Sequence, residues 1–416
     1  MVLHHLPAPG AGGLEGQVHD LCSGLMERGI DVRVVCRPSL YLPASDVPLQ
    51  GRVTALPAAE PPAQHDTPFL QLWHTSRELY KAEELTAYDV VHIQSHYGFH
   101  AALHVVGRSG PRPALVSTFH LTALGGMLRL QELGLPQEPD LLLTQPAAVM
   151  EATLARLSDH SIVVSQQVRD DLTTGYGAAP DRISVVYNGI DTDLFTPRPR
   201  EEARAQLGLD PGLRYVLYVG PLFGFRGRTL LDCLPLLEPD VRVLMIWPST
   251  GLDQPPPSGD RLVHVGYVPH NEMPLYYSAA ELLAYPLVYT GFGLSLLEAS
   301  ACGCVPVAFG LPPTTELVPD TAWLVDDITP RAFAETMNTA LRDPETVKKA
   351  RDGIHLARTA QFGRDRMVDQ TLAAYNVAIR AVTRDDESDA EDGSGERPRV
   401  TNDAAAPHYS AGGSTS

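Results

Sequence analysis

The sequence is poor in lysine and cysteine and lacks a long apolar run, and each shortage excludes a class of protein. Lysine occurs only at Lys81, Lys348 and Lys349, and 50 acidic residues against 32 basic ones give a net charge of −18 over 416 residues. Nucleic acids and anionic membranes bind basic faces, so we expect neither as a partner. No apolar run approaches the ~18 residues of a membrane-spanning helix, and the first residues predict no signal peptide.

The five cysteines form no metal-binding pattern. They are Cys22, Cys36, Cys233, Cys302 and Cys304. The last two are separated by one residue, which is too short a spacing for a zinc pair and indicates packing as small apolar side chains. We therefore expect no metal site from this pattern, and a reducing cytoplasm as the location of the protein.

Short apolar runs alternate with helix-like segments in two cycles. The first cycle has a helical pattern at 17–28 and strand patterns at 32–36, 90–93, 115–118 and 161–164, and the second has strand patterns at 215–219, 241–246, 262–265, 282–285 and 305–308. Runs that are apolar on both faces are typical of buried parallel strands. A proline-rich linker at 196–200 separates the cycles. The sequence therefore predicts an α/β protein of two domains, with ligands beyond the carboxyl ends of the strands.

The most informative segment is residues 290–306, Thr-Gly-Phe-Gly-Leu-Ser-Leu-Leu-Glu-Ala-Ser-Ala-Cys-Gly-Cys-Val-Pro. Its first two glycines permit a tight turn that a ligand can approach closely. The turn opens a helix at residues 293–295, whose free N–H groups and dipole suit a phosphate or diphosphate. Glu298 lies about one turn further, where its carboxylate can accept two hydrogen bonds from a ribose diol. On these residues alone, a glycine-tight loop that enters a core helix is an equal alternative.

This segment resembles the donor-site signature of the family 4 glycosyltransferases, which are retaining enzymes of the GT-B fold. The resemblance continues in chain order over roughly residues 1–380, through motifs at 12–15, 88–92, 116–120, 161–165, 185–191, 215–220 and 265–269. It implies two Rossmann-like domains that face each other across a cleft. It also implies a hexosyltransferase that moves a sugar from a nucleotide-diphosphate donor, with UDP the first candidate, to a small-molecule or glycan acceptor. No metal or other cofactor is implied.

The resemblance also assigns the parts of the chain. Residues 1–197 would form the acceptor-binding domain and residues 198–366 the nucleotide-sugar-binding domain. Residues 367–383 would form a helix that returns to the first domain. Residues 384–416 are rich in acidic residues, proline, alanine, glycine and serine, so we expect a disordered tail there.

Each candidate site residue matches a position of the family pattern. Glu298 would hold the ribose, and His120 would hydrogen-bond a sugar hydroxyl or stabilise the transition state. Arg226 stands where the family usually has a phosphate-binding lysine, and a guanidinium can bind phosphate with two hydrogen bonds. Ordinary alternatives are an exposed helix residue, a turn histidine and a solvated loop arginine. The other diphosphate-binding candidates are Gly12, Gly13, Gly293, Leu294 and Ser295.

Two positions depart from the family pattern. Thr290 stands where a glutamate normally contacts the donor sugar, and Pro221 stands where an arginine is usual. Threonine keeps a hydroxyl but loses the charge of the glutamate. Two explanations are open: an altered donor, such as a deoxy or amino sugar, or a loss of catalysis. A second hypothesis is therefore a non-catalytic GT-B module that binds a nucleotide sugar or a partner enzyme. A third, phosphorolysis or epimerisation, is less favoured, because no lysine lies in the glycine-rich or strand-end context expected for a phosphorylase cofactor.

Overall fold

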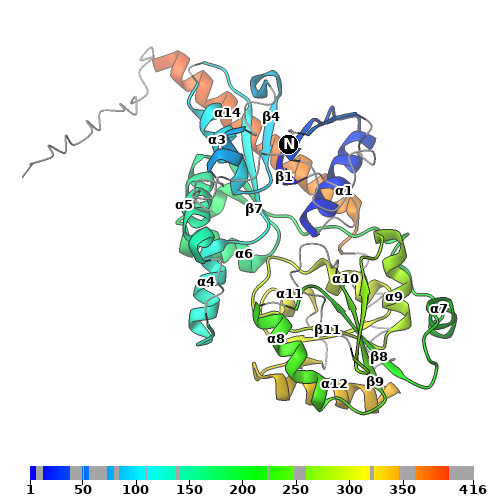
Figure 1. The fold of residues 1–416 in the computed structure, drawn as a ribbon. Helices are drawn as coiled ribbons and strands as arrows, with labels where there is room; N and C mark the ends of the chain where they lie inside the picture. Colours follow the sequence, from blue (N-terminus) through cyan, green and yellow to red (C-terminus); the bar gives the residue numbers. More distant parts are fainter. Residues whose placement is uncertain are drawn as a thin grey trace, which may run out of the picture.

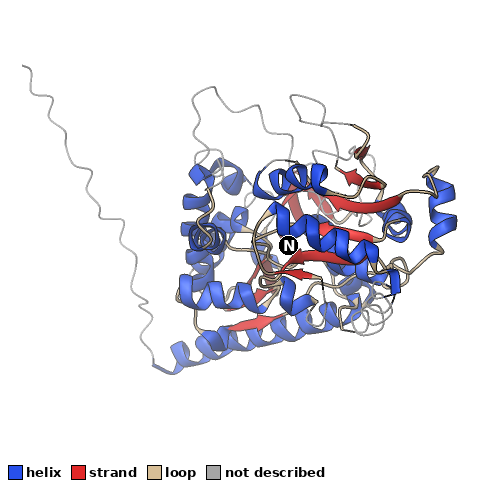
Figure 2. Cartoon of the chain, turned by 90° about the horizontal axis from the view of Figure 1, so that it is seen from below, coloured by secondary structure: helices blue, strands red, loops and turns tan. Residues whose placement is uncertain are grey.

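The fold consists of two parallel β-sheets, each flanked by helices, as a computed structural model of the chain shows (Figure 1, Figure 2). The structure describes residues 1–5, 13–37, 49, 51–55, 73–78, 84–108, 110–136, 141–222, 224–247, 259–318, 323–345, 348 and 361–392. The predicted α/β class with two Rossmann-like domains is confirmed.

The first sheet has seven strands among the described residues, in the order β3-β2-β1-β4-β5-β6-β7. Neighbouring residues of its central strand β5 join different apolar clusters, which Leu115 and Val116 illustrate, so both faces of the sheet are covered. The strands are β1 (Val2–His5), β2 (Val34–Arg37), β3 (Val53–Ala55), β4 (Val90–Ile93), β5 (Ala114–Phe119), β6 (His160–Val163) and β7 (Ile183–Val185). The helices around it are α1 (Gly13–Glu27), α3 (Phe99–Val106), α4 (Ala123–Glu132), α5 (Leu141–Leu157) and α6 (Gln166–Asp170).

The second sheet has six strands in the described part of the chain, in the order β10-β9-β8-β11-β12-β13. Its central strands β8, β9 and β11 are almost wholly buried, as their apolar sequences predict. The strands are β8 (Arg214–Val219), β9 (Val241–Ile246), β10 (Leu262–Gly266), β11 (Leu282–Tyr285), β12 (Val305–Phe309) and β13 (Leu324–Val325). The helices are α7 (Arg200–Leu207), α8 (Gly224–Cys233), α9 (Met273–Ala279), α10 (Leu294–Ala301), α11 (Thr314–Leu317) and α12 (Pro330–Arg342).

The last helix, α14 (Arg364–Asp392), crosses back to the first sheet. It begins near the segment that follows β7, where the Ile190 N–H donates to the Phe362 carbonyl at 2.8 Å. Its apolar residues Val368, Ala374 and Ala378 then pack in the same cluster as the buried face of α1. The chain therefore crosses between the two domains twice, through the linker and through α14.

The structure corrects the expected start of the acidic tail. We expected disorder from residue 384, but α14 continues to Asp392. Residues 393–416 lie outside the described residues. Within the described chain, none of the helices combines the length and apolar composition that crossing a membrane requires.

Candidate functional site

A cleft of about 480 Å³ lies between the two domains, at the carboxyl ends of the strands of both sheets. It is the position in which an open parallel sheet binds its ligands. Gly12 lies outside the described residues. The cleft brings together all the other candidate residues, which are Gly13, His120, Arg226, Thr290, Gly293, Leu294, Ser295 and Glu298.

Residues 290–295, which we call the donor turn, lead from β11 into α10. Gly293 caps the helix in the left-handed region, with φ 108° and ψ 59°. A Cβ built on Gly293 would also stand 2.8 Å from the hydroxyl oxygen of Tyr285, so both conformation and space require glycine. The N–H groups of Leu294 and Ser295 belong to the first turn of α10, where a helix offers no acceptor of its own. They make this end of the cleft a site of positive potential.

Thr290 lies near a tyrosine that the sequence motifs do not include. Tyr285, the last residue of β11, lies beside the donor turn, since its hydroxyl oxygen is 2.8 Å from where a Cβ of Gly293 would stand. Burial raises the pKa of Tyr285, and the nearby Thr290 side chain and Arg226 charge lower it. The threonine hydroxyl therefore lies beside a buried phenol at the position where the family has a glutamate.

Arg226 lies in the first turn of α8, and not on a loop as the ordinary alternative for this residue would have it. Its guanidinium lies near Gly220, since a Cβ built on Gly220 would stand 3.3 Å from Arg226 Nη1. Pro221 is fixed beside it, because the Tyr218 hydroxyl donates to the Pro221 carbonyl at 2.5 Å. Of the described residues that line the cleft, Arg226 is the one arginine or lysine. It supplies the positive charge that these residues offer to a diphosphate.

Glu298 lies on α10 and is paired with a second unpredicted tyrosine. The Tyr277 hydroxyl of α9 donates to Glu298 Oε2 at 2.8 Å. Burial raises the pKa of Glu298, the neighbouring His270 and the Tyr277 bond lower it, and Asp20 of α1 raises it. A carboxylate offers about four acceptor positions. The bond to Tyr277 thus orients Glu298 and leaves capacity for a diol.

His120 follows the end of β5 on the opposite wall of the cleft. Its Nε2 is 2.8 Å from Gln94 Oε1, an amide oxygen that can only accept. Nε2 therefore carries the proton, and Nδ1 is left as an acceptor. Burial lowers the pKa of His120 to about 4, with Glu15 opposing the shift. The imidazole is consequently neutral at physiological pH.

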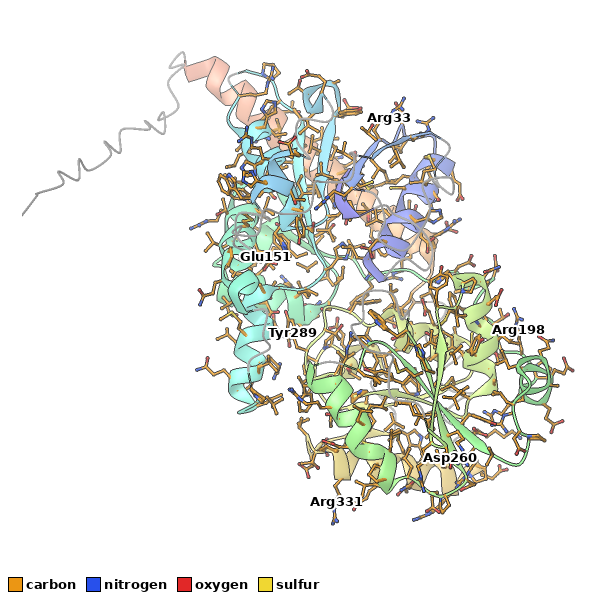
Figure 3. The ribbon with its side chains drawn as sticks, viewed as in Figure 1. Arg33, Glu151, Arg198, Asp260, Tyr289 and Arg331 are labelled. Atoms are coloured by element: carbon orange, nitrogen blue, oxygen red, sulfur yellow. The ribbon has the colours of Figure 1, made fainter. Side chains whose placement is uncertain are left out.

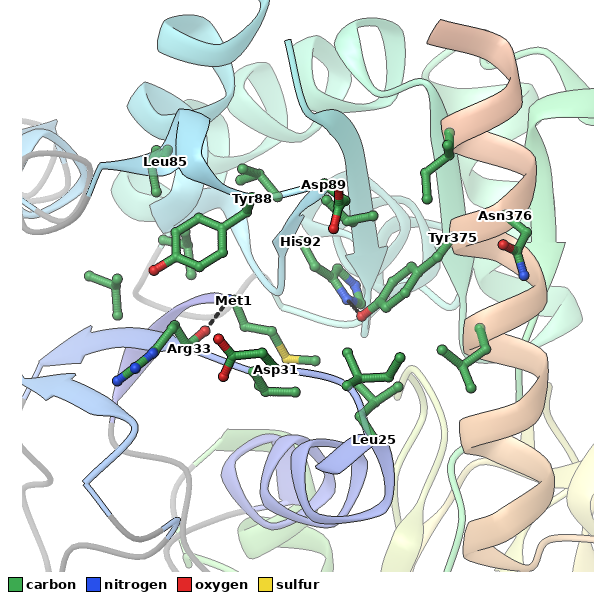
Figure 4. A pocket seen from close by; sticks show the side chains of 18 residues that line it. Met1, Leu25, Asp31, Arg33, Leu85, Tyr88, Asp89, His92, Tyr375 and Asn376 are labelled. Atoms are coloured by element: carbon green, nitrogen blue, oxygen red, sulfur yellow. Dashed lines mark hydrogen bonds between the residues drawn. The ribbon is translucent and has the colours of Figure 1, made fainter. Parts of the chain in front are cut away.

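Gln94 is itself supported by a buried chain of polar groups. The Gln94 amide nitrogen lies 3.3 Å and 3.4 Å from the two ring nitrogens of His92. Those ring nitrogens are 2.7 Å from Thr118 Oγ1 and 2.7 Å from the Tyr375 hydroxyl of α14. Figure 4 shows Tyr375 and His92 meeting at the edge of a second cavity, of about 230 Å³, near the amino ends of the first sheet's strands. The orientation of His120 thus depends on contacts that extend to α14.

The two walls of the cleft touch beside the donor turn. The Ser165 hydroxyl donates to the Gly291 carbonyl at 2.7 Å, so the N-cap residue of α6 in the first domain contacts the turn directly. Further out, the Gln166 N–H donates to Glu316 at 3.0 Å, and the Tyr187 hydroxyl donates to the same carboxylate at 2.6 Å. The structure therefore has the cleft in a closed arrangement.

These groups suit a ligand with a diphosphate centre, a diol at one end and a polyhydroxylated group at the other. Arg226 and the donor turn offer a positive charge and free N–H groups, Glu298 offers carboxylate acceptors, and His120 and Thr290 offer a ring nitrogen and a hydroxyl. Among the described residues, no group of three or more His, Cys, Asp or Glu side chains is arranged to hold a metal ion.

Two family models match the chain, one on each domain. The model described as Glycosyltransferase Family 4 matches residues 11–194. The model described as Glycosyl transferases group 1 matches residues 258–355. The second match contains the donor turn and Glu298.

Curated relatives align along most of the chain. A D-inositol 3-phosphate glycosyltransferase of Mycobacterium sp. (strain KMS) is 30% identical over 392 residues, which cover 89% of this chain and 86% of the relative. D-inositol 3-phosphate glycosyltransferase 1 of Catenulispora acidiphila is 30% identical over 394 residues, which cover 89% and 91%.

Solved structures share the two-domain fold. Sucrose-phosphate synthase from Thermosynechococcus elongatus superposes with a TM-score of 0.77 at 22% identity, covering 91% of this chain and 98% of that one. Anabaena HepE, solved in complex with UDP and glucose, has a TM-score of 0.66 at 17% identity, covering 90% and 99%. At these identities the likeness concerns the fold alone.

Proposed function

This chain belongs to the family 4 glycosyltransferases of the GT-B fold, and we propose that it uses a UDP-sugar as donor and an uncharged hydroxyl compound as acceptor. The enzyme transfers a sugar from a nucleotide-diphosphate donor to an acceptor hydroxyl with retention of the anomeric configuration. The observation that carries the finer proposal is the convergence of Arg226, the donor turn, Glu298 and His120 on one cleft from two domains.

The diphosphate is held by Arg226, by the N–H groups of the donor turn and by the glycine loop at Gly12 and Gly13. As the bond between the sugar and the diphosphate breaks, negative charge develops on the leaving diphosphate. A guanidinium and the amino end of a helix stabilise that charge in place of a metal. This role is supported by the position of Arg226, the one arginine or lysine among the described residues of the cleft lining. We propose that the reaction needs no metal.

The nucleoside and the sugar are held on opposite sides of the diphosphate. Glu298, oriented by Tyr277, accepts hydrogen bonds from the ribose diol. Neutral His120 accepts a hydrogen bond from a sugar hydroxyl through Nδ1, because Gln94 occupies Nε2. The Thr290 hydroxyl, in the cleft lining, contacts the sugar where a carboxylate is usual. Threonine in place of glutamate fits a donor with an altered hydroxyl pattern. A sugar that lacks the matching hydroxyl would leave a buried carboxylate without a partner, which costs about 1–3 kcal/mol or more.

UDP is favoured as the nucleotide because the similarly folded Anabaena HepE was solved with UDP. The curated relatives are named for inositol 3-phosphate, so a cyclitol is the first acceptor to test. The described cleft lining has no arginine or lysine on the side of the first domain. This favours an uncharged polyol or sugar over its phosphate ester.

In this proposal, residues 1–197 form the domain that binds the acceptor, and residues 198–366 form the domain that binds the donor. The proposed location is the cytoplasm, which the five buried free cysteines favour.

The test is acceptor-dependent release of nucleoside diphosphate by the purified protein. UDP-sugars and other nucleotide sugars are offered with inositol, inositol 3-phosphate and simple sugars. The proposal expects UDP release that rises with an uncharged acceptor. If nucleoside diphosphate is released only with inositol 3-phosphate, the proposal of an uncharged acceptor is wrong. If the protein prefers another nucleotide sugar, the proposal of UDP is wrong.

A further inference from the structure

Tyr289 reaches from the second domain into the first. It lies directly before Thr290, and Figure 3 labels it at the boundary between the two domains. Its hydroxyl oxygen is 3.0 Å from the backbone nitrogen of Thr122, 2.9 Å from Thr122 Oγ1 and 2.7 Å from Asp171 Oδ2. One side chain beside the donor turn thus makes three polar contacts with the opposite wall.

These contacts belong to a larger hydrogen-bond network. Asp171 Oδ2 accepts from the Tyr289 hydroxyl and, at 3.0 Å, from the Thr122 hydroxyl, while the Thr122 N–H donates to the tyrosine oxygen. Thr122 Oγ1 accepts from the Gly125 N–H as the cap of α4. Gln167 Nε2 donates to Asp171 Oδ1 at 2.8 Å. A connected network of this kind restricts the positions of its members.

Helix α4 has two glycines where the Tyr289 ring enters. A Cβ built on Gly125 would stand 2.3 Å from Asp171 Oδ2 and 2.6 Å from the Tyr289 hydroxyl. A Cβ built on Gly126 would stand 3.3 Å from Tyr289 Cδ1. Glycine inside a helix is destabilising relative to alanine. The two glycines therefore lower the stability of α4 but leave room for the Tyr289 ring and the Asp171 carboxylate. We call Thr122, Gly125, Gly126 and Asp171 the socket.

The socket adjoins the candidate reacting groups on both walls. Thr122 is two residues beyond His120, and Tyr289 directly precedes Thr290. Asp171 begins a π-helical turn, Asp171–Gly175, a type of distortion that recurs at functional sites. Displacement of Tyr289 from the socket would therefore move Thr290 relative to His120.

We propose that Tyr289 is a positioning residue for sugar transfer, which fixes the donor turn against the His120 wall by filling the socket on α4. The inference rests on the proposed function of the cleft. It assigns Tyr289 no contact with the substrate, so its effect is on turnover rather than on nucleotide binding.

Tyr289→Phe keeps the ring and removes the hydroxyl. We expect kcat to fall roughly tenfold or more, since small misplacements of reacting groups are costly, with the Kd of the nucleoside diphosphate changed less than about twofold. Tyr215→Phe is the matched control. It also removes the hydroxyl of a buried tyrosine, here one that donates to the Asp210 carbonyl at 3.3 Å within the second domain and outside the cleft lining, and keeps the ring beneath the Arg204 guanidinium. Its kcat should stay within about twofold of the native value.

Gly126→Leu tests the socket from the side of α4. Leucine has a higher helix propensity than glycine, so a purely structural role of α4 predicts unchanged turnover. The socket predicts a loss of kcat similar to that of Tyr289→Phe. The double variant should be little worse than either single one, because both remove the same contact.

Hydrogen exchange separates this inference from the proposed function, since it needs no substrate. The amides of residues 122–126 should exchange roughly tenfold faster or more in Tyr289→Phe than in the native protein, because local opening becomes easier. If the native protein turns over no donor, the proposed function fails, and the exchange result still decides the socket. Native kcat in Tyr289→Phe, or unchanged exchange at residues 122–126, would overturn the inference.

Discussion

The carbonyl oxygen of His120 lies against the Cα of Gly291, across the boundary between the two domains. A Cβ built on Gly291 would stand 1.4 Å from that oxygen. Backbone atoms occupy both sides of the contact, so neither side can move away as a flexible side chain would. The glycine at this position therefore permits the closed cleft, in addition to shaping the donor turn.

Gly291→Ala should block this closed arrangement. We expect kcat to fall roughly a hundredfold, because the reacting groups no longer reach their positions, while each domain still folds. The measurement is kcat together with the melting temperature. Gly259→Ala is the control, since an added Cβ there meets no atom within 4 Å. Native turnover in Gly291→Ala would mean that the enzyme does not need this contact.

Glu298→Ala should weaken nucleotide binding. Hydrogen bonds to a charged group contribute roughly 1.5–3 kcal/mol, so affinity for the nucleoside diphosphate should fall by about tenfold or more. Titration calorimetry measures this directly. Tyr277→Phe, which removes the hydroxyl that orients Glu298, should show a smaller loss of the same kind. Unchanged affinity in a folded Glu298→Ala protein would exclude a ribose-binding role.

Arg226→Ala should weaken binding of the diphosphate much more than binding of the nucleoside. The guanidinium supplies charge and paired hydrogen bonds to phosphate oxygens, and the nucleoside lacks that group. Arg226→Lys should restore part of the loss, because it keeps the charge without the planar fork. Equal losses for the two ligands would indicate that Arg226 acts through the packing of α8.

The pH dependence of kcat should reflect the low pKa of His120. Burial lowers that pKa to about 4, so the neutral form that accepts a hydrogen bond persists as the pH falls below the usual histidine value of ~6.5. We expect kcat to stay level from about pH 8 to 5.5 and to fall only below that range. Gln94→Glu places a carboxylate beside the ring, which raises the pKa and moves the acid limb to higher pH. A native midpoint near 6.5 would contradict a buried, neutral His120.

The sequence predicts strand positions correctly where both faces of the strand are buried. The predicted strands 90–93, 241–246 and 282–285 match β4, β9 and β11, because a strand covered on both faces is apolar throughout. The apolar pattern does not reveal β1 or the edge strands β3, β7 and β13. The edge strands have only two or three residues, so pairing with a neighbour defines them more than composition does.

The candidate site followed from motifs, and the partners of its residues did not. Gln94 and Tyr277 meet His120 and Glu298 only through the packing of neighbouring strands and helices, which no local spacing predicts. The tail boundary failed for another reason. The apolar pattern ends near Val382, but an established helix extends at the cost of fixing one residue at a time, so α14 continues into the acidic run.

Donor consumption by the native protein and by Thr290→Glu tests the central claim most directly. We predict that the native protein consumes a nucleotide sugar with an altered hydroxyl pattern, such as a deoxy or amino sugar, and that Thr290→Glu reduces this activity, because the buried carboxylate lacks a partner on that sugar. Product analysis should find the anomeric configuration retained. A protein that binds nucleotide but consumes no donor in a broad panel would contradict the account, as would turnover of an ordinary hexose donor that Thr290→Glu improves.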